Sequence, residues 1–324
     1  MDAKPRHFNN FDYLRLYLAV EVVFTHLWGA LLLPGSVRSP AVFLNAVPTF
    51  VALSGFLIPA SLASSESLWV FARKRFLRTI PALIPMLACV GLYFGVHVMW
   101  ATIIDYVTLG YGTKDGVAPL WSLGVEDCLY ASMVIVYLLG AFKRPAFLWF
   151  ALVLFTVLSC VWPDHLFAYR LFFTAEGFIV GNLLYVYREK LSKIPVWLSV
   201  LCIVAGNIPI VPIYGLLLGL QVFGAITAAV NLPQAKAKIP DLSYGIYIWH
   251  SPIIFAMVVM PSIGREMVLI PCALAATALA AALSWFLVEK PALRLKKSAQ
   301  RRKLEPEEDV AVITTPVLAS GSSG

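Results

Sequence analysis

An arginine and a histidine lie inside the first hydrophobic segment of the chain, FDYLRLYLAVEVVFTHLWGALLL. A charged or titratable side chain costs several kcal/mol or more in hydrocarbon, so Arg15 and His26 are candidates for a functional site. Their spacing of eleven residues is about 20° from three full helical turns, so both should face the same direction. Along the helix axis they are about 16 Å apart, roughly half the hydrocarbon thickness. One helix would therefore present a cation near one membrane surface and a potential base near the other.

Glu126 is a candidate partner for His26. If the first segment starts near residue 12 and the fourth runs back from about residue 119, both side chains lie about 10 Å below the outer membrane surface. A carboxylate fixes the tautomer of a neighbouring histidine and stabilises the imidazolium, so the pair could act as a general base. The alternative is an interhelical hydrogen bond that only holds the helices together.

A basic run, FARKRFLRTIP, follows the second hydrophobic segment. Arg75 and Arg78 are three residues apart and would be neighbours on one helical face, while Arg73 and Lys74 add charge. Arginine forks suit phosphate groups, which would make this segment a phosphate clamp. From composition alone the alternative is favoured, in which these charges only set the orientation in the membrane.

Other polar side chains inside hydrophobic segments could face the same cleft or pair with each other. Arg170 and Glu176 are about 9 Å apart along the axis of the segment 165–187. His250 lies in SYGIYIWHSP, where Pro252 removes a backbone hydrogen bond, and it could line a cavity or join two helices. No metal site is expected, because no histidine or acidic pair has HExxH-like spacing and the cysteines are scattered.

The composition sets the environment in which these side chains must work. Hydrophobic residues make up 60% of the 324 residues, charged residues make up 13%, and the mean hydropathy is +0.81. Soluble proteins have about 25% charged residues, so the fold class expected is all-α, a polytopic integral membrane protein. Residues 1–294 would form one membrane domain, and 295–324 a disordered cytoplasmic tail whose final SGSSG resembles a linker. About ten transmembrane helices are predicted, at 12–33, 41–63, 79–100, 118–141, 146–163, 165–187, 195–210, 213–231, 242–260 and 266–288.

Lysine and arginine residues set the orientation, because they accumulate in cytoplasmic loops. With ten spans and both termini cytoplasmic, almost all of the 25 basic residues fall on the cytoplasmic side. The exceptions are Arg15 and Arg170 within spans, and Arg38, Lys114 and Arg265 on the outer side. This asymmetry explains the pI of about 9.1 without a nucleic-acid partner.

Six segments together resemble the membrane acyltransferase 3 family. They are FDYLRLYLAVEVVFTH, PTFVALSGFLI, FARKRFLRTIP, LWSLGVEDCLY, SYGIYIWHSP and FLVEKP. Each is weak alone, but all six in this order on a ten-span topology are specific, and they cover nearly the whole hydrophobic chain. Where many relatives read WSLSVEEQFY, this chain has Gly124, Asp127 and Cys128 but keeps Glu126, so a role for the second carboxylate does not carry over.

The resemblance implies an O-acyltransferase of the bacterial inner membrane, a multi-pass protein that uses acetyl-CoA or another acyl-CoA. The acyl group would pass from the cytoplasm to a hydroxyl of a carbohydrate acceptor at the outer face. Because no added soluble domain is present, an exopolysaccharide or a lipid-linked oligosaccharide precursor is the expected acceptor. The residues implied are His26, Glu126 and Arg15 for catalysis, Arg75, Arg78, Arg73 and Lys74 for CoA, and Trp121, Ser122, Tyr244, His250, Arg170 and Glu176 for the substrate or its tunnel.

Several alternatives stay open at this point. His26 could deprotonate the acceptor hydroxyl, or it could form a covalent acyl-histidine. Packing is the alternative role for Trp121, Ser122 and Tyr244. A proton-coupled transporter or flippase of a polar solute could use the same buried charges as a proton relay, and a non-catalytic assembly subunit could use them only to bind helices together. Oligomeric state is not predicted.

Overall fold

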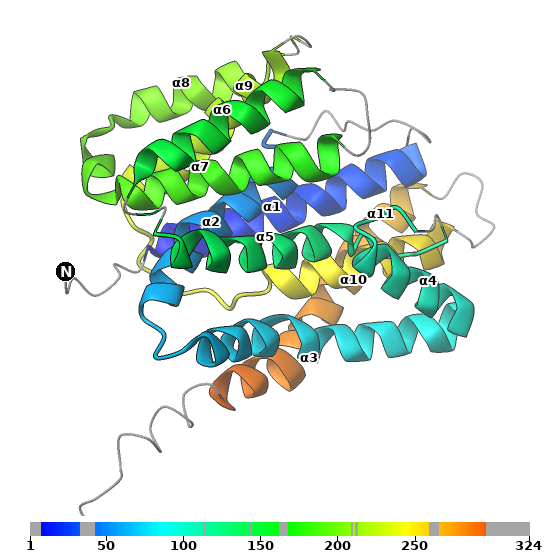
Figure 1. The fold of residues 1–324 in the computed structure, drawn as a ribbon. Helices are drawn as coiled ribbons and strands as arrows, with labels where there is room; N and C mark the ends of the chain where they lie inside the picture. Colours follow the sequence, from blue (N-terminus) through cyan, green and yellow to red (C-terminus); the bar gives the residue numbers. More distant parts are fainter. Residues whose placement is uncertain are drawn as a thin grey trace, which may run out of the picture.

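The computed structural model describes residues 8–32, 43–112, 115–140, 142, 144–161, 168–208, 210, 213–258 and 266–295. Across these ranges the chain forms helices and no strands (Figure 1). The all-α prediction is therefore confirmed for the described part of the chain. Nearly all of the predicted cytoplasmic tail lies outside the described residues.

The helices follow the hydrophobic segments of the sequence. Each predicted span overlaps one of them, because an apolar run of this length buries its backbone polar groups most readily as a helix. In chain order they are α1 (Asn9–Leu27), continued by a π-helix (Trp28–Leu32), α2 (Ala46–Ala63), α3 (Leu68–Phe94), α4 (Val96–Val107), α5 (Trp121–Leu138), α6 (Pro145–Val161), a π-helix (Ala168–Phe173) that continues as α7 (Thr174–Val186), a short 3-10 helix (Arg188–Lys193), α8 (Val196–Gly206), α9 (Tyr214–Asn231), α10 (Ser243–Val258), and α11 (Glu266–Ser284), continued by a π-helix (Trp285–Glu289).

Within the described residues, five segments are long and apolar enough to cross a membrane. They are Ala46–Ala63, Leu68–Phe94, Trp121–Leu138, Tyr214–Asn231 and Val268–Leu295. Helices α4, α6 and α8 are apolar but shorter. The membrane character of the protein is supported by these segments, whereas the count of ten spans and the cytoplasmic placement of both termini stay predictions.

Helix α3 differs from the predicted third span, 79–100, at both ends. It begins at Leu68 because the Ser67 hydroxyl accepts a hydrogen bond from the backbone N–H of Val70, so the basic run lies in the helix and not in a linking loop. It ends at Gly95, whose φ of 99° is a conformation that residues with a side chain rarely adopt. The apolar residues beyond Gly95 form the separate helix α4.

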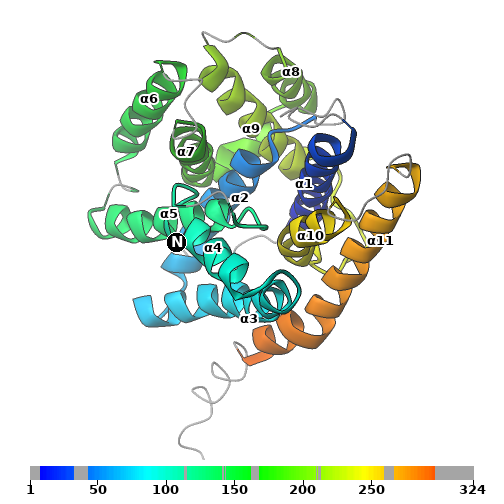
Figure 2. The same ribbon diagram turned by 90° about the vertical axis from the view of Figure 1, so that its right-hand side faces the viewer.

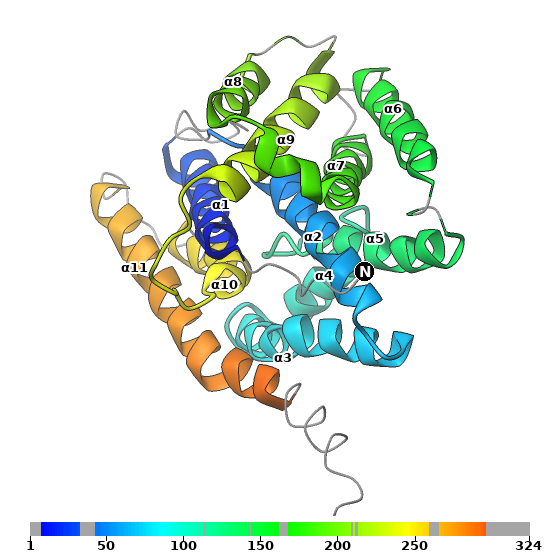
Figure 3. The same ribbon diagram turned by 90° about the vertical axis from the view of Figure 1, so that its left-hand side faces the viewer.

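The end-on views place α2 near the centre of the bundle, with α1, α7 and α9 around it and α6, α8 and α11 at the periphery (Figure 2 and Figure 3). Glycines let α2 and α7 approach closely. A Cβ atom at Gly181 would lie 2.1 Å from the carbonyl oxygen of Ala52, and one at Gly55 would lie 2.2 Å from that of Phe178. Small residues permit such backbone contact between membrane helices.

Helix α1 packs against α10, which packs in turn against α11. Ala19, Val23 and Leu27 of α1 share a buried cluster with Ile246 and Ile254 of α10. This packing decides which side chains lie beside His26, in the last turn of α1.

Candidate active site

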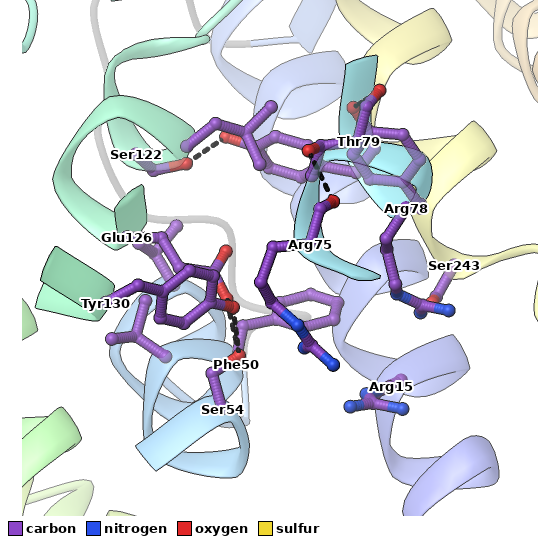
Figure 4. A pocket seen from close by; sticks show the side chains of 15 residues that line it. Arg15, Phe50, Ser54, Arg75, Arg78, Thr79, Ser122, Glu126, Tyr130 and Ser243 are labelled. Carbon is purple, nitrogen blue, oxygen red and sulfur yellow. Dashed lines mark hydrogen bonds between the residues drawn. The ribbon is translucent and has the colours of Figure 1, made fainter. Parts of the chain in front are cut away.

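A cavity of about 100 Å³ lies among α1, α2, α3, α5 and α10 (Figure 4). It brings together six of the predicted site residues, which come from four of these helices. They are Arg15, Arg75, Arg78, Ser122, Glu126 and Tyr244. Val47, Phe50, Val51, Ser54, Thr79, Leu123, Tyr130, Ser243 and Tyr247 complete the wall.

Three arginines share one side of this cavity, where Figure 4 shows their guanidinium groups gathered. Arg78 forms a salt bridge of 2.5 Å with Asp241, just before α10, and Arg15 lies 3.9 Å from Asp12. Arg75 donates to the Ser61 hydroxyl at 3.4 Å, and its buried Nε has no hydrogen-bond partner among the described residues. Such a gathering of donors suits an anionic group.

Arg73 and Lys74 do not line the cavity. Arg73 is exposed, and the Lys74 ammonium donates to the Ser65 hydroxyl at 3.1 Å. The helical twist of α3 therefore directs Arg75 and Arg78 inward while these two basic residues point elsewhere. Of the four basic residues predicted to form one site, Arg75 and Arg78 line the cavity and the other two do not.

Glu126 is held by hydroxyl groups and not by His26, which corrects the predicted pairing. The Ser54 hydroxyl of α2 and the Tyr130 hydroxyl, one turn further along α5, both donate to Glu126 Oε1 (Figure 4). The Tyr130 hydroxyl also lies 3.1 Å from Ser54 Oγ. Among the described residues no hydrogen bond joins Glu126 to His26. Two residues at equal depth on different helices need not be neighbours. Helix α1 packs chiefly on α10 and α2, not on α5, which carries Glu126.

The neighbour of His26 is a second histidine. The two ring centroids of His26 and His250 are 4.7 Å apart, with the rings inclined at 67°. His26 Nδ1 lies 2.9 Å from the carbonyl oxygen of Val22, and His250 Nδ1 lies 2.6 Å from that of Tyr247. Since a carbonyl only accepts, each Nδ1 carries the hydrogen and each Nε2 presents a lone pair.

Tyr247 connects this histidine pair to the cavity. The centroid of its ring lies 5.9 Å from that of His250, and Tyr247 lines the cavity together with Ser122. The hydroxyl donates to the carbonyl oxygen of Pro119 at 2.7 Å, so it accepts from Ser122 Oγ at 2.5 Å. Tyr244, one turn earlier, donates to the carbonyl oxygen of Thr79 at 2.8 Å and ties α10 to α3.

A second cavity, of about 680 Å³, is lined largely by the segment between α4 and α5. Two further predicted residues, Trp121 and Arg170, are placed here and not in the first cavity. The Arg170 guanidinium lies over the rings of Trp121 and Tyr111, 5.2 and 5.5 Å from their centroids. It also donates to the carbonyl oxygen of Gly110. Gly110 has a φ of 83°, and a Cβ atom there would lie 1.8 Å from Arg170 Nη1. Asp105 and Ser251 add polar groups to the wall.

Glu176 lines neither of these two cavities, contrary to its predicted role at the substrate or tunnel. It is buried in α7, where the Thr156 hydroxyl of α6 donates to it at 2.8 Å. The sequence analysis missed Ser54, Tyr130, Asp241 and Tyr247. Tyr130 follows Glu126 by one helical turn, so its position on the same helical face was the available signal.

An all-helical membrane protein whose arginines, carboxylate and hydroxyl groups converge on one cavity, with a histidine pair beside it, has the features of a membrane-embedded enzyme. The family model described as "Acyltransferase domain" matches residues 8–289. The chain belongs to this family, the acyltransferase 3 family, and the resemblance drawn from the sequence is confirmed. The protein is therefore a membrane acyltransferase.

Two similar proteins are consistent with this assignment. "Nodulation protein 10" of Rhizobium leguminosarum bv. viciae is 29% identical over 357 residues, covering 92% of this chain and 96% of that protein. "Putative acetyltransferase ORF330" of Acidianus two-tailed virus is 25% identical over 276 residues, covering 73% and 80% respectively. No solved structure matches the chain significantly.

Proposed function

We propose that the protein moves an acetyl or other short acyl group from cytoplasmic acyl-CoA to a hydroxyl of a carbohydrate at the outer face of the inner membrane. The observation that supports this most strongly is the convergence of Arg15, Arg75 and Arg78 on one cavity. CoA carries phosphates that arginine forks bind well, and a membrane acyltransferase needs an activated acyl donor.

The size of the first cavity limits which part of the donor can enter it. A volume of about 100 Å³ is far below the roughly 300–1,000 Å³ of pockets that enclose drug-sized ligands. The nucleotide of CoA would therefore remain at the mouth, against the arginines. The narrow pantetheine arm would pass between α1, α3 and α10 towards Tyr247 and the histidine pair.

The second cavity is the proposed acceptor site. Arg170 offers N–H donors, Asp105 offers carboxylate oxygens, and Ser251 offers a hydroxyl at its wall. Trp121 and Tyr111 add flat apolar faces beside these polar groups. Such a mixture suits a ring that is apolar on its faces and rich in hydroxyls at its edge, as sugars are. An exopolysaccharide or its lipid-linked precursor is the class of acceptor we propose.

In the proposed reaction His26 acts as the general base. Its Nε2 takes the proton from the acceptor hydroxyl, and the oxygen attacks the thioester carbonyl. The carbon–sulfur bond breaks, and the CoA thiolate takes the proton from His26. The same lone pair could instead attack the thioester and form an acyl-histidine, which is the competing mechanism.

The experiment is free-thiol release from acetyl-CoA by the detergent-purified protein, combined with thermal stabilisation by acetyl-CoA. We expect wild type to release thiol, His26→Ala to abolish release without loss of folding, and Arg78→Ala to raise the acetyl-CoA concentration needed. Arg188→Ala is the matched control, because Arg188 is exposed and lies over Tyr185, outside both cavities.

The two measurements, thermal stabilisation and thiol release, separate the outcomes. Stabilisation by acetyl-CoA without thiol release would mean that the acceptor must be bound before turnover. Neither stabilisation nor release with any acyl-CoA would contradict the proposed donor and favour a protein that moves a polar solute.

A further inference from the structure

His250 is a buried histidine whose Nε2 has no hydrogen-bond partner among the described residues. Its side chain is 0% exposed, in the middle of α10. Leaving a buried acceptor unpaired costs about 1–3 kcal/mol, so such an atom in a native structure needs an explanation. A residue that served only to join two helices would be expected to use this nitrogen.

The position of His250 suggests what the free nitrogen is for. Tyr247, one turn before it, lines the first cavity, while Ser251, the next residue, lines the second. The Ser251 hydroxyl donates to the carbonyl oxygen of Val117, on the segment between α4 and α5 that lines the second cavity. His250 lines neither cavity itself, but it lies on α10 between Tyr247 of the proposed donor site and Ser251 of the proposed acceptor site, with His26 against its ring.

The two histidine rings are in edge-to-face contact, with centroids 4.7 Å apart. Each Nδ1 hydrogen is already donated to a carbonyl of its own helix, so both free nitrogens are acceptors. Two lone pairs cannot form a hydrogen bond with each other. Once either Nε2 takes up a proton, the other ring, in contact with it, carries an acceptor. Tyr247 is a further titratable side chain whose ring lies beside that of His250, and its hydroxyl bonds to the carbonyl oxygen of Pro119 and to Ser122 Oγ.

We propose that His250 is the positioning residue of His26, in the role that the sequence analysis gave to Glu126. His26 Nε2 takes the proton of the acceptor hydroxyl, and as the oxygen moves away to attack the thioester carbonyl, the N–H that is left donates to His250 Nε2. This hydrogen bond orients the ring and stabilises the imidazolium until the thiolate takes the proton. The oxygen–hydrogen and carbon–sulfur bonds break, and the carbon–oxygen and sulfur–hydrogen bonds form. The proposal rests on the acyl transfer proposed above.

The first test measures turnover. His250→Phe keeps a ring of similar shape but removes the acceptor, whereas His250→Gln keeps a side-chain oxygen that can accept. We expect His250→Phe to lower kcat about 10-fold to 100-fold, below the roughly 10²–10⁴-fold that a general base supplies, with the KM for acetyl-CoA unchanged. His250→Gln should recover part of the loss. His97→Phe, at an exposed histidine of α4, is the matched control.

The second test does not depend on turnover. In protein labelled with ¹⁵N-histidine, the ring nitrogens are followed by NMR as the pH is lowered, with His26→Gln used to assign signals. We expect the His26 and His250 signals to shift together as one proton is bound, and the His26 transition to move in His250→Phe. Independent transitions, or a His26 transition unchanged in His250→Phe, would overturn the proposal. If wild type releases no thiol, the spectra still decide whether the pair shares a proton, so failure of the proposed function is recognised separately.

Discussion

Glu126 shares one carboxylate oxygen between the hydroxyl groups of Ser54 and Tyr130. Hydrogen bonds to a carboxylate are about twice as strong as those between neutral groups, so this cluster fixes the side chain on the cavity wall. The Arg75 guanidinium lines the same cavity. At the scale of single residues, Glu126 therefore adds a carboxylate to a cavity that three arginines line, and its hydrogen bonds are to Ser54 and Tyr130.

Removing the Tyr130 hydroxyl should take away one of the two hydrogen bonds to Glu126 and leave the bond from Ser54. We expect Tyr130→Phe to lower kcat/KM for acetyl-CoA about tenfold, because a hydrogen bond to a charged group contributes about 1.5–3 kcal/mol. Glu126→Gln should cost more, since it also removes the charge beside the arginines. The measurement is steady-state thiol release. Tyr137→Phe, two turns further along α5 and exposed, should behave as wild type; an equal loss in both tyrosine variants would contradict the role of the cluster.

Asp241 links pH to stability. Burial alone would raise its pKa, but the guanidinium groups of Arg78 and Arg15, together with a hydrogen bond from Ser243, hold the pKa of this carboxyl below its ordinary value. Its stabilising effect is therefore fully present above an ordinary aspartate pKa of about 3.9 and is lost as the pH falls towards the lower folded-state value.

We expect Asp241→Asn to lower the melting temperature clearly at pH 7, because it leaves Arg78 without its salt-bridge partner. The difference from wild type should shrink as the pH falls below about 4. Thermal unfolding in detergent across this range is the measurement, with Glu189→Gln at an exposed position as the control. A difference that stays constant with pH would show that the carboxylate charge is not responsible.

At the scale of the helices, the contact between α2 and α7 depends on glycine. We expect Gly181→Ala to destabilise the protein by about 1–3 kcal/mol, because its methyl group would overlap the backbone carbonyl of Ala52 and push the two helices apart. Gly91→Ala is the control, since there the added methyl group would meet the flexible Met99 side chain, with Sδ at 3.1 Å. The two melting temperatures test this, and equal values would contradict the expected difference.

Hydropathy predicts where the helices lie because length and apolarity decide them locally. It fails at the boundary of α3 and α4, where the basic run extends the helix on one side and Gly95 ends it on the other. The site was harder to predict. Depth along a helix gave Glu126 as a partner for His26, but only packing shows that α10 lies beside α1. A shared site for Arg15, Arg75 and Arg78 was expected only from the family resemblance, because composition alone favoured a role of the basic run in setting the orientation.

At the scale of the whole molecule, the ten-span topology with both termini in the cytoplasm can be tested with single cysteines. We expect Lys238→Cys, in the exposed segment between α9 and α10, to react with a membrane-impermeant maleimide only after the membrane is opened. Asp115→Cys, in the exposed segment between α4 and α5, should react in intact cells. Labelling of both positions in intact cells would contradict the orientation. The parent protein with its five native cysteines removed is the control.

Arg15 and His26 are about 16 Å apart along α1, so a transfer between their two positions takes place within the electric field of the membrane. Moving one elementary charge across a membrane involves about 2.3 kcal/mol per 100 mV. In the proposed reaction a neutral acyl group replaces a hydrogen at the outer face, and that hydrogen leaves as part of a neutral thiol. No net charge crosses the field. Acyl transfer should therefore proceed at the same equilibrium in energised and de-energised vesicles, whereas a proton-coupled transporter of the same shape would respond to the voltage.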